Sequence, residues 1–441
     1  NLKKHGLEIL RFNTGTPSRV DRRSLHMDKM ELEEGDPENH AFSFMSERKD
    51  RNKRNCWLTY TNEKTHEIIR ENIMRAPKYA GKIHGIGARY CPSIEDKVVR
   101  FADKDRHQLF VEPEGLDTTE MYVQGMSTSM PIDVQYAFLR TIPGFEDVKM
   151  MRPAYAIEYD LLDPLQLYPT LEVIKLPGLY SAGQSNGTSG YEEAAAQGLV
   201  AGINAALKIQ GKDPFILARH EAYIGSLVDD LVTKGADEPY RMMTSRSEYR
   251  LILRQDNADL RLTEKGHSIG LVGEERYARF LERKKKYEEA MDYIRTQRFT
   301  PKEEINRALE SMGTAPLTTG TGADQILKRP EMTYWKMMEM LGCPAFDEEA
   351  VEEMEITVKY EGYIARQEAA VRKAARMENE KLPPDMDYLS LDGISTEARQ
   401  KMDKIRPLSL GQAARIPGVS PADISVLMVY VKQRKGKKGA E

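Results

Sequence analysis

PGLYSAGQSNGTSGYEEAAAQGLVAGI, at Pro177–Ile203, is more informative about architecture than any other segment of this 441-residue chain. It predicts a short strand over Leu179–Ala182, followed by a loop of Gly, Ser, Asn and Thr residues. A helix rich in small residues then begins, with Ser189 or Gly190 as its cap. A strand, a glycine-rich loop and a helix in this order are typical of a crossover in an α/β domain.

The start of this predicted helix is suited to bind a ligand oxygen. Glu192 and Glu193 lie in its first turn, where the helix dipole favours acidic residues, and free amides there can meet a flavin carbonyl or a phosphate. Ala194, Gly198 and Gly202 recur every four residues, so one helix face can closely approach a sheet or a flat ligand. A tightly packed crossover without any ligand explains the same pattern equally well.

Composition places the whole chain among ordinary globular proteins, with 40% hydrophobic and 30% charged residues. Its length suggests about three domains. With 65 basic and 69 acidic residues the formal net charge is −4, so nucleic-acid binding requires local basic patches. Cys56, Cys91 and Cys343 form no C-x-x-C pair, which argues against a disulfide framework or a structural zinc site. Without a signal peptide or membrane-spanning stretch, a reduced cytoplasmic enzyme is expected.

The two halves of the chain differ in pattern. Up to about residue 210, short β-rich runs alternate with Gly and Pro, whereas long helical periodicities follow after Asp213. Strands are predicted within 107–113, 120–131, 154–162, 170–174 and 179–182. Helices are predicted over Thr65–Met74, Val134–Thr141, Phe215–Lys234, Ser245–Arg254, Glu274–Gln297 and Val351–Asn379.

A cysteine stands in an unusual local setting within Gly85–Asp103. Cys91 precedes Pro92, so a helix is predicted to begin at Pro92 or Ser93. A thiol at a helix N-terminus beside Arg89 is stabilised as a thiolate, although two acids in the first turn oppose this effect. A small buried thiol without any reaction is the alternative interpretation.

Three arginines recur at four-residue spacing in SRSEYRLILR, which predicts guanidinium groups on one helical face. Arg246, Arg250 and Arg254 form this set, and Arg241 precedes it. Such a face can follow the phosphate backbone of an RNA. The alternative is a solvated face paired with nearby acids. The tail at 410–433 predicts two helices around a turn, suited to a phosphate clamp or to docking of a partner protein.

Six further motifs occur together along the chain. They are NTGTPSRVD (13–21), TNEKTH (61–66), ARYCPSIEDKVVRFAD (88–103), GYEEAAAQG (190–198), EPYRMMTSRSEYRL (238–251) and DNADLRLT (256–263). In this order they resemble the tRNA uridine 5-carboxymethylaminomethyl modification enzyme family, MnmG/GidA, over essentially the whole chain. That family begins with a G-x-G-x-x-G turn, so the chain is expected to lack about the first 190 residues, with much of the dinucleotide site and one of two family cysteines.

The resemblance implies an α/β fold with an additional all-α C-terminal region. The α/β part would be an incomplete FAD-binding two-dinucleotide-fold flavoprotein with an inserted NAD-binding-like domain. The expected domains are 1–30, the remainder of the FAD-binding domain; 31–150, the inserted nicotinamide-cofactor-binding-like domain; 151–213, the C-terminal part of the FAD-binding domain; 214–365, a helical domain; and 366–441, a C-terminal helical subdomain.

The resemblance also implies site residues. Cys91 would be catalytic, as a nucleophile or as an acid/base toward the uridine ring or the carbon carrier. FAD would be held by Gly183, Gln184, Asn186, Gly187, Gly190, Tyr191 and Glu192. NAD would be held by Gly87, Ala88, Arg89, Tyr90, Lys97, Arg100 and Phe101. The arginine pattern itself adds tRNA contacts at Arg241, Arg246, Arg250 and Arg254.

The activity implied is FAD-dependent modification of the wobble uridine of tRNA at carbon 5, forming a carboxymethylaminomethyl or aminomethyl group. Methylenetetrahydrofolate would donate the carbon, NADH would reduce the flavin, and glycine or ammonium would supply nitrogen. A GTPase partner, a homodimer and inactivity of the truncated chain alone are also expected. Two alternatives are a folate- and FAD-dependent tRNA uridine C5-methyltransferase, which lacks the long helical region, and a non-catalytic RNA- or partner-binding fragment.

Overall fold

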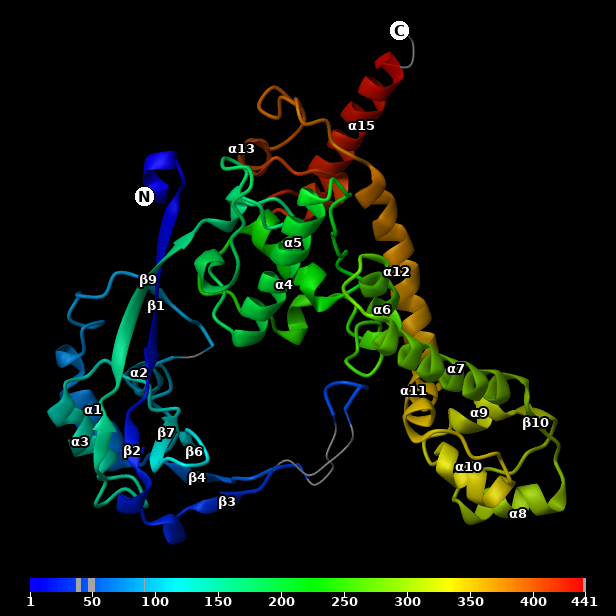
Figure 1. Ribbon diagram of the computed structural model, residues 1–441, viewed down its shortest axis with the longest axis horizontal. Coiled ribbons are helices and arrows are strands. Elements are labelled where there is room, and N and C mark those ends of the chain that lie inside the picture. The colour runs from blue at the N-terminus through cyan, green and yellow to red at the C-terminus, as the bar shows by residue number, and fades with distance from the viewer. Residues whose placement is uncertain (37–40, 47–51, 91, 439–441) are drawn as a thin grey trace. The chain divides into compact units, whose positions relative to one another are not determined.

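The computed structural model describes residues 1–36, 41–46, 52–90 and 92–438, and the chain divides into two units. The first unit comprises Asn1–Phe215 with Gly235–Met242, and the second comprises Ile216–Lys234 with Met243–Glu441. Sheets and helices alternate in the first unit. In the second, the described strands are only β10 (Arg298–Phe299) and β11 (Thr321–Gly322) (Figure 1). The predicted α/β class with an all-α C-terminal region is thus confirmed.

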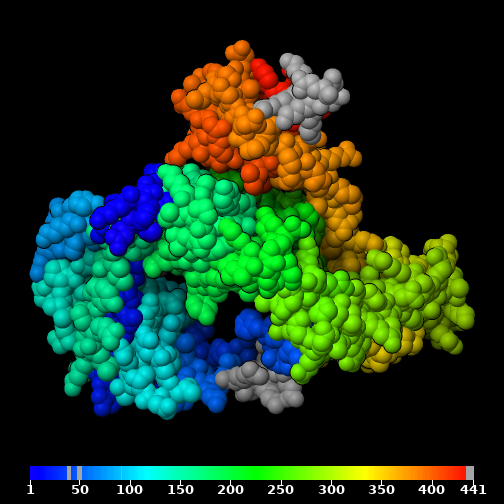
Figure 2. Space-filling view, turned by 45° about the horizontal axis from the view of Figure 1, so that its top comes forward, coloured from blue at the N-terminus to red at the C-terminus, as the bar shows by residue number. Residues whose placement is uncertain are grey.

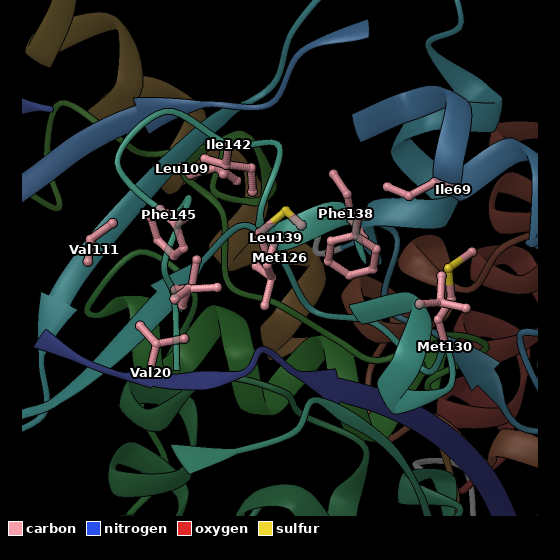
Figure 3. Close-up of a cluster of buried hydrophobic side chains, with 14 of the residues drawn as sticks. Val20, Ile69, Leu109, Val111, Met126, Met130, Phe138, Leu139, Ile142 and Phe145 are labelled. Carbon is pink, nitrogen blue, oxygen red and sulfur yellow. The ribbon is translucent and has the colours of Figure 1, made fainter. Parts of the chain in front are cut away.

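A six-stranded sheet with antiparallel neighbours forms most of the first unit, in the order β3-β4-β6-β7-β2-β8. Alternate residues are buried, such as Leu109 and Val111 on one strand, because successive side chains point to opposite faces. Figure 3 shows these side chains beside Phe138 and Leu139 in the core. The strands are β2 (Arg19–Asp21), β3 (Glu31–Glu33), β4 (Cys56–Tyr60), β6 (Gln108–Pro113), β7 (Glu120–Gln124) and β8 (Met150–Arg152), and the helices are α1 (Glu63–Glu71), α2 (Ile94–Arg100) and α3 (Ile132–Leu139).

A second sheet of three strands carries the chain into and out of this domain, in the order β5-β1-β9. β1 (Ile9–Thr16) pairs antiparallel with β9 (Tyr155–Leu162) along its whole length, and the two lie side by side in Figure 1. β5 (Ile86–Gly87) pairs parallel with the middle of β1. The sheet therefore places the glycine-rich residues 85–89 against the backbone of β1.

The strands predicted at 170–174 and 179–182 are wrong. The segment makes only single bridges, Leu167 to Val173 and Glu172 to Tyr180. Its other backbone groups bond within turns, as when the Val173 N–H donates to the Leu179 carbonyl oxygen at 2.8 Å. A strand requires a ladder of neighbouring residues, which this compact excursion does not form.

The second unit consists of helices around two separate apolar cores. One core gathers side chains between Ala290 and Val358, and the other gathers those between Leu382 and Val431. Figure 2 shows the two regions, yellow-green to yellow and orange, as separate lobes of this unit. The helices are α5 (Tyr223–Lys234), α6 (Ala258–Ser268), α7 (Glu274–Thr296), α8 (Glu303–Ser311), α9 (Ala323–Leu327), α10 (Tyr334–Leu341), α11 (Glu348–Lys359), α12 (Glu361–Asn379), α13 (Thr396–Ile405), α14 (Leu410–Arg415) and α15 (Pro421–Lys438).

The helix predicted at Glu274–Gln297 is confirmed as α7, whereas three others in this half differ from the prediction, one of them at Ser245–Arg254. The helix over Val351–Asn379 is interrupted at Tyr360, which separates α11 from α12. α11 buries apolar side chains and α12 buries none, so one periodicity spans two helices with different surroundings. The helix predicted from Phe215 begins only at Tyr223, because the preceding residues carry Arg219 into a cluster of carboxylates.

A buried carboxyl group on α11 gives the second unit a specific pH dependence. Glu353 is 5% exposed, and its Oε1 lies 2.5 Å from Nη2 of Arg254. Burial and the neighbouring Asp256 carboxylate raise the pKa of Glu353 to about 8. The folded protein therefore holds a proton that the unfolded chain releases above its ordinary pKa of 4.5. This contribution to stability is complete below that pKa and is lost as the pH rises toward about 8.

We expect Glu353→Gln to remove this pH dependence, because the amide stays neutral. Relative to wild type, the variant should gain about 1 kcal/mol of stability per pH unit as the pH rises from about 5 to 8. Denaturant unfolding at several pH values measures the difference, with the exposed Glu304→Gln on α8 as the control. Parallel stability curves for Glu353→Gln and wild type would contradict the assignment.

Candidate functional site

One glutamine of α4 (Tyr191–Ile209) holds the glycine-rich loop that precedes this helix. Oε1 of Gln197 accepts hydrogen bonds from the Gly183 N–H at 3.1 Å and from Nδ2 of Asn186 at 2.9 Å. Its Nε2 donates to Oγ1 of Thr188 at 2.9 Å. Gln197 is fully buried, so the loop conformation is fixed from inside the unit.

The residues predicted to hold FAD lie together along this loop and the first turn of α4. Four of these seven residues are buried in the loop and three are exposed. Those buried are Gly183, Asn186, Gly187 and Gly190, and those exposed are Gln184, Tyr191 and Glu192. The exposed group includes an aromatic ring that is 85% accessible.

The N-terminus of α4 fits the carbonyl oxygens of a flavin. Its N-cap, Gly190, offers no side-chain cap to the first-turn amides. A Cβ at this position would lie 1.7 Å from Oε2 of Glu193, so a larger residue there would have to displace the end of this side chain. The amide donors of the first turn match the carbonyl oxygens of a flavin ring.

A cavity of about 420 Å³ lies beside β1 and the 85–89 loop in the same unit. Gly85 approaches β1 so closely that a Cβ would lie 2.7 Å from the backbone of Phe12. Hydroxyl, amide and charged side chains of both signs line the cavity. They belong to Asn13, Lys78, Arg89, Ser93, Glu95, Asp96, Arg100, Ser127, Thr128, Ser129 and Glu238.

The residues predicted to hold NAD are only partly brought together. Gly87, Ala88, Arg89 and Arg100 line the cavity. Nζ of Lys97 instead donates to the Gly125 carbonyl oxygen at 3.1 Å. Tyr90 and Phe101 have exposed side chains and are not part of the cavity lining. Cys91, predicted to be catalytic, lies outside the described residues.

Two acids that follow the cysteine have partners that the sequence did not reveal. α2 begins after its cap Ser93, which confirms the predicted helix start. Oδ2 of Asp96 lies 2.5 Å from Nζ of Lys78, and Oδ1 accepts a hydrogen bond from the Tyr79 hydroxyl. Burial raises the pKa of Asp96, but the Lys78 ammonium outweighs it, so the pKa is lowered. The Glu95 carboxylate accepts hydrogen bonds from Ser129, while its Oε2 has no partner in the described part of the chain.

The helix predicted at Ser245–Arg254 is wrong. A short 3₁₀ turn, Thr244–Arg246, is followed by irregular turns. Oε1 of Gln367, from α12, accepts the N–H groups of Leu251 and Ile252 at 3.1 and 3.3 Å. The Ile252 N–H also donates to the Tyr249 carbonyl oxygen at 3.0 Å, within a turn that does not continue as a helix. The arginines of the segment therefore do not share a helical face.

The four arginines proposed for tRNA differ in their surroundings. Arg254 points inward, where it forms an ion pair with Asp256 at 2.9 Å and a hydrogen bond with the carboxyl group of Glu353. The pairing with a nearby acid agrees with the alternative interpretation, although the side chain is not solvated. Arg246 is partly buried. Arg241 and Arg250 are exposed.

Two other kinds of site are absent from the described ranges. None of the helices there combines the length and apolar character that a bilayer crossing requires. Those ranges also contain no group of three or more His, Cys, Asp or Glu side chains arranged to hold a metal ion.

Three family models match the chain. The model described as glucose inhibited division protein A matches residues 1–213. The model described as the C-terminal helical domain of the tRNA modifying enzyme MnmG/GidA matches residues 274–368, and that of its C-terminal helical bundle matches 370–441.

Curated relatives match almost the whole chain. A protein of Caldicellulosiruptor saccharolyticus named tRNA uridine 5-carboxymethylaminomethyl modification enzyme MnmG is 56% identical over 440 residues, which are 99% of this chain and 70% of the relative. A protein of the same name from Clostridium kluyveri is 56% identical over 98% of this chain and 69% of its own length.

Solved structures are similar as well. Two crystal forms of Aquifex aeolicus GidA superpose with a TM-score of 0.85, at 45% and 46% sequence identity. The matches cover 97% of this chain and 68% or 69% of the Aquifex chain.

Proposed function

The chain belongs to the MnmG/GidA family of tRNA-modifying enzymes, and from this premise we propose that it modifies carbon 5 of the wobble uridine of tRNA in a FAD-dependent reaction. The observation that carries the proposal is the presence, in one unit, of the uncapped N-terminus of α4 and the polar cavity beside the 85–89 loop. The product would carry a carboxymethylaminomethyl or aminomethyl group.

FAD, when bound, supplies reversible two-electron chemistry. The first-turn amides of α4 would bind the flavin carbonyl oxygens, and the loop fixed by Gln197 would keep these donors oriented without reorganisation. Arg89 and Arg100, at the cavity, would bind the phosphates of NADH. Methylenetetrahydrofolate is the proposed carbon donor. Cys91 would act on the uridine ring or on the carbon carrier.

We further propose the partners that the family resemblance implies. These are tRNA, a GTPase of the same modification pathway and a second copy of the chain in a homodimer. The cytoplasm is the proposed compartment, because tRNA and the nucleotide cofactors are found there.

A reconstituted reaction tests the function. The enzyme, extended at its N-terminus to the length of its MnmG relatives and loaded with FAD, is incubated with tRNA, methylenetetrahydrofolate, NADH, glycine or ammonium and the GTPase. The uridine nucleosides are then identified by mass spectrometry. We expect carboxymethylaminomethyl- or aminomethyluridine. Methyluridine alone would instead support the methyltransferase alternative, and the absence of both product and flavin absorbance would support a non-catalytic binding fragment.

The exposed arginines provide a test of tRNA binding that does not depend on the chemistry. If Arg250 contacts a phosphate, Arg250→Ala should weaken binding of all tRNAs and reduce the salt slope of log K by about 0.7–0.9. Titrations at several salt concentrations measure the slope. Arg254→Ala is the matched comparison, because its ion pair with Asp256 and its hydrogen bond with Glu353 predict a lower melting temperature instead. An unchanged slope for Arg250→Ala would exclude this contact.

A further inference from the structure

A short segment interrupts the second unit in sequence, but its contacts assign it to the first unit. The chain leaves α5 at Lys234, joins the first unit over Gly235–Met242 and then continues in the second unit. We name this segment the 235–242 strap. Both of its ends are therefore covalently attached to the helical unit, while its own contacts are made with the α/β unit.

The strap is hydrogen-bonded to the loop that precedes α4. The Tyr240 N–H donates to the Gly187 carbonyl oxygen at 2.8 Å, and the Ser189 N–H donates to the Tyr240 carbonyl oxygen at 2.9 Å. Thr188 and Tyr240 thus form a parallel bridge. Since Tyr240 is buried, these bonds are shielded from water and hold the loop in addition to its bonds with Gln197.

The strap also bonds to α4 itself. The Met242 N–H donates to Oε1 of Glu193 at 2.7 Å, and this carboxylate is 4% exposed. The same carboxylate lies next to Gly190, the N-cap of α4. Farther along the strap, Ala236 packs against Phe12 of β1. The strap is therefore attached to both β1 and the first turn of α4.

One strap residue reaches the other part of the site. Oε2 of Glu238 lies 3.0 Å from Nε of Arg89, and both residues line the cavity. The Arg89 side chain is otherwise largely exposed, with 66% of its surface accessible. A long exposed side chain samples many rotamers, so an anchored carboxylate that accepts from its Nε restricts the direction of the guanidinium group.

We propose that the 235–242 strap positions two loops of the site, the loop that precedes α4 and the 85–89 loop. In this proposal Glu238 is a positioning residue, which keeps the Arg89 guanidinium oriented toward an anionic cofactor. The inference rests on the proposed function, because it assigns Arg89 to the NADH phosphates. Glu238 itself does not contact the cofactor. Because Glu238 already restricts the Arg89 side chain before the cofactor binds, binding costs less side-chain conformational entropy.

A double-mutant cycle tests this role in the FAD-loaded holoenzyme, with NADH oxidation as the assay. We expect Glu238→Ala, which removes the oxygen that accepts from Nε of Arg89, to raise the KM for NADH about threefold to fivefold with little change in kcat. Arg89→Gln should raise it further, and the double variant should be no worse than Arg89→Gln alone, since Glu238 acts only through Arg89. Asp237→Asn, an exposed change on the same strap, is the control.

Three results would overturn the inference. Additive effects of the two substitutions, or an unchanged KM in Glu238→Ala, would show that the residues act independently. A lower KM would show that Glu238 repels the cofactor instead of positioning its partner. Failure of the proposed function is distinguishable, because the wild-type enzyme would then not oxidise NADH at all.

The contact with α4 provides a second measurement. Glu193→Gln retains an oxygen that accepts from Met242, whereas Glu193→Ala removes it. We expect the visible absorption spectrum of the bound flavin to change in the alanine variant and to resemble wild type in the glutamine variant. If both variants have the same flavin spectrum as wild type, the strap does not position the loop that precedes α4.

Discussion

Replacement of Cys91 by serine is expected to lower uridine modification by at least about a hundredfold, whichever of its two proposed roles the thiol has. A hydroxyl keeps the size of the side chain but is not ionised near neutral pH, so it is both a poor nucleophile and a poor acid or base. The change introduces no new charge. FAD content and tRNA affinity should therefore remain near wild type, and nucleoside analysis of the reacted tRNA measures the loss.

Cys56→Ser is the matched control for this prediction. Cys56 lies on β4, where burial raises the pKa of its thiol, and it has no part in the proposed site. The control should retain activity while Cys91→Ser loses it. Retention of most activity by Cys91→Ser would show that this thiol only packs, as the alternative interpretation of the sequence holds.

The sequence was sufficient to predict where α4 begins and which kinds of residue form its first turns. Gly190 as a cap, acids in the first turn and a helix of small residues all depend on interactions between residues close in sequence. The cap Ser93 before α2 and the long helix α7 were predictable for the same reason. Backbone capping and helical periodicity act over a few residues, so they are visible without a structure.

The errors occur where distant partners determine the conformation. The spacing of Arg246, Arg250 and Arg254 is helical, but the amides of this segment bond to Gln367 on α12, more than a hundred residues away. The strap was likewise invisible, because Glu238 meets Arg89 from a distant part of the chain. Periodicity carries no information about such partners, so neither Glu193 nor Glu238 could be identified as a positioning residue.

The helix predicted from Phe215 failed for a related reason, which identifies the most consequential charge of the second unit. Arg219, in the segment before α5, is 8% exposed at its side chain. Its Nη1 lies 2.7 Å from Oδ1 of Asp230 and 3.1 Å from Oδ2 of Asp229, and its Nη2 lies 2.9 Å from Oε1 of Glu248. Burial alone would lower the pKa of this guanidinium, yet the three carboxylates raise it, so Arg219 remains charged.

Arg219→Met should destabilise the second unit by about 3–5 kcal/mol, the usual effect of removing one partner of a buried ion pair. Methionine fills much of the volume, but Asp230, 1% exposed, would lose the Arg219 guanidinium and keep the Lys234 ammonium beside it. Burial raises the pKa of Asp230, and Arg219 and Lys234 lower it below its ordinary value of 3.8. The ionised Asp230 carboxylate therefore contributes to the stability of wild type only above its ordinary pKa. The difference in the free energy of unfolding between wild type and Arg219→Met should narrow as the pH falls below about 4.

Denaturant unfolding of wild type and Arg219→Met near neutral pH and at acid pH measures both effects. Arg307→Met is the control, because Arg307 is 75% exposed and pairs only with Glu303 on the surface of α8, where loss of an ion pair costs less than about 1 kcal/mol. A similarly small loss for Arg219→Met would mean that water or the backbone compensates the buried carboxylates. A large loss that does not narrow at acid pH would assign the effect to the contacts of Arg219 with the carbonyl oxygens of Ser226 and Arg246 instead of to its charge.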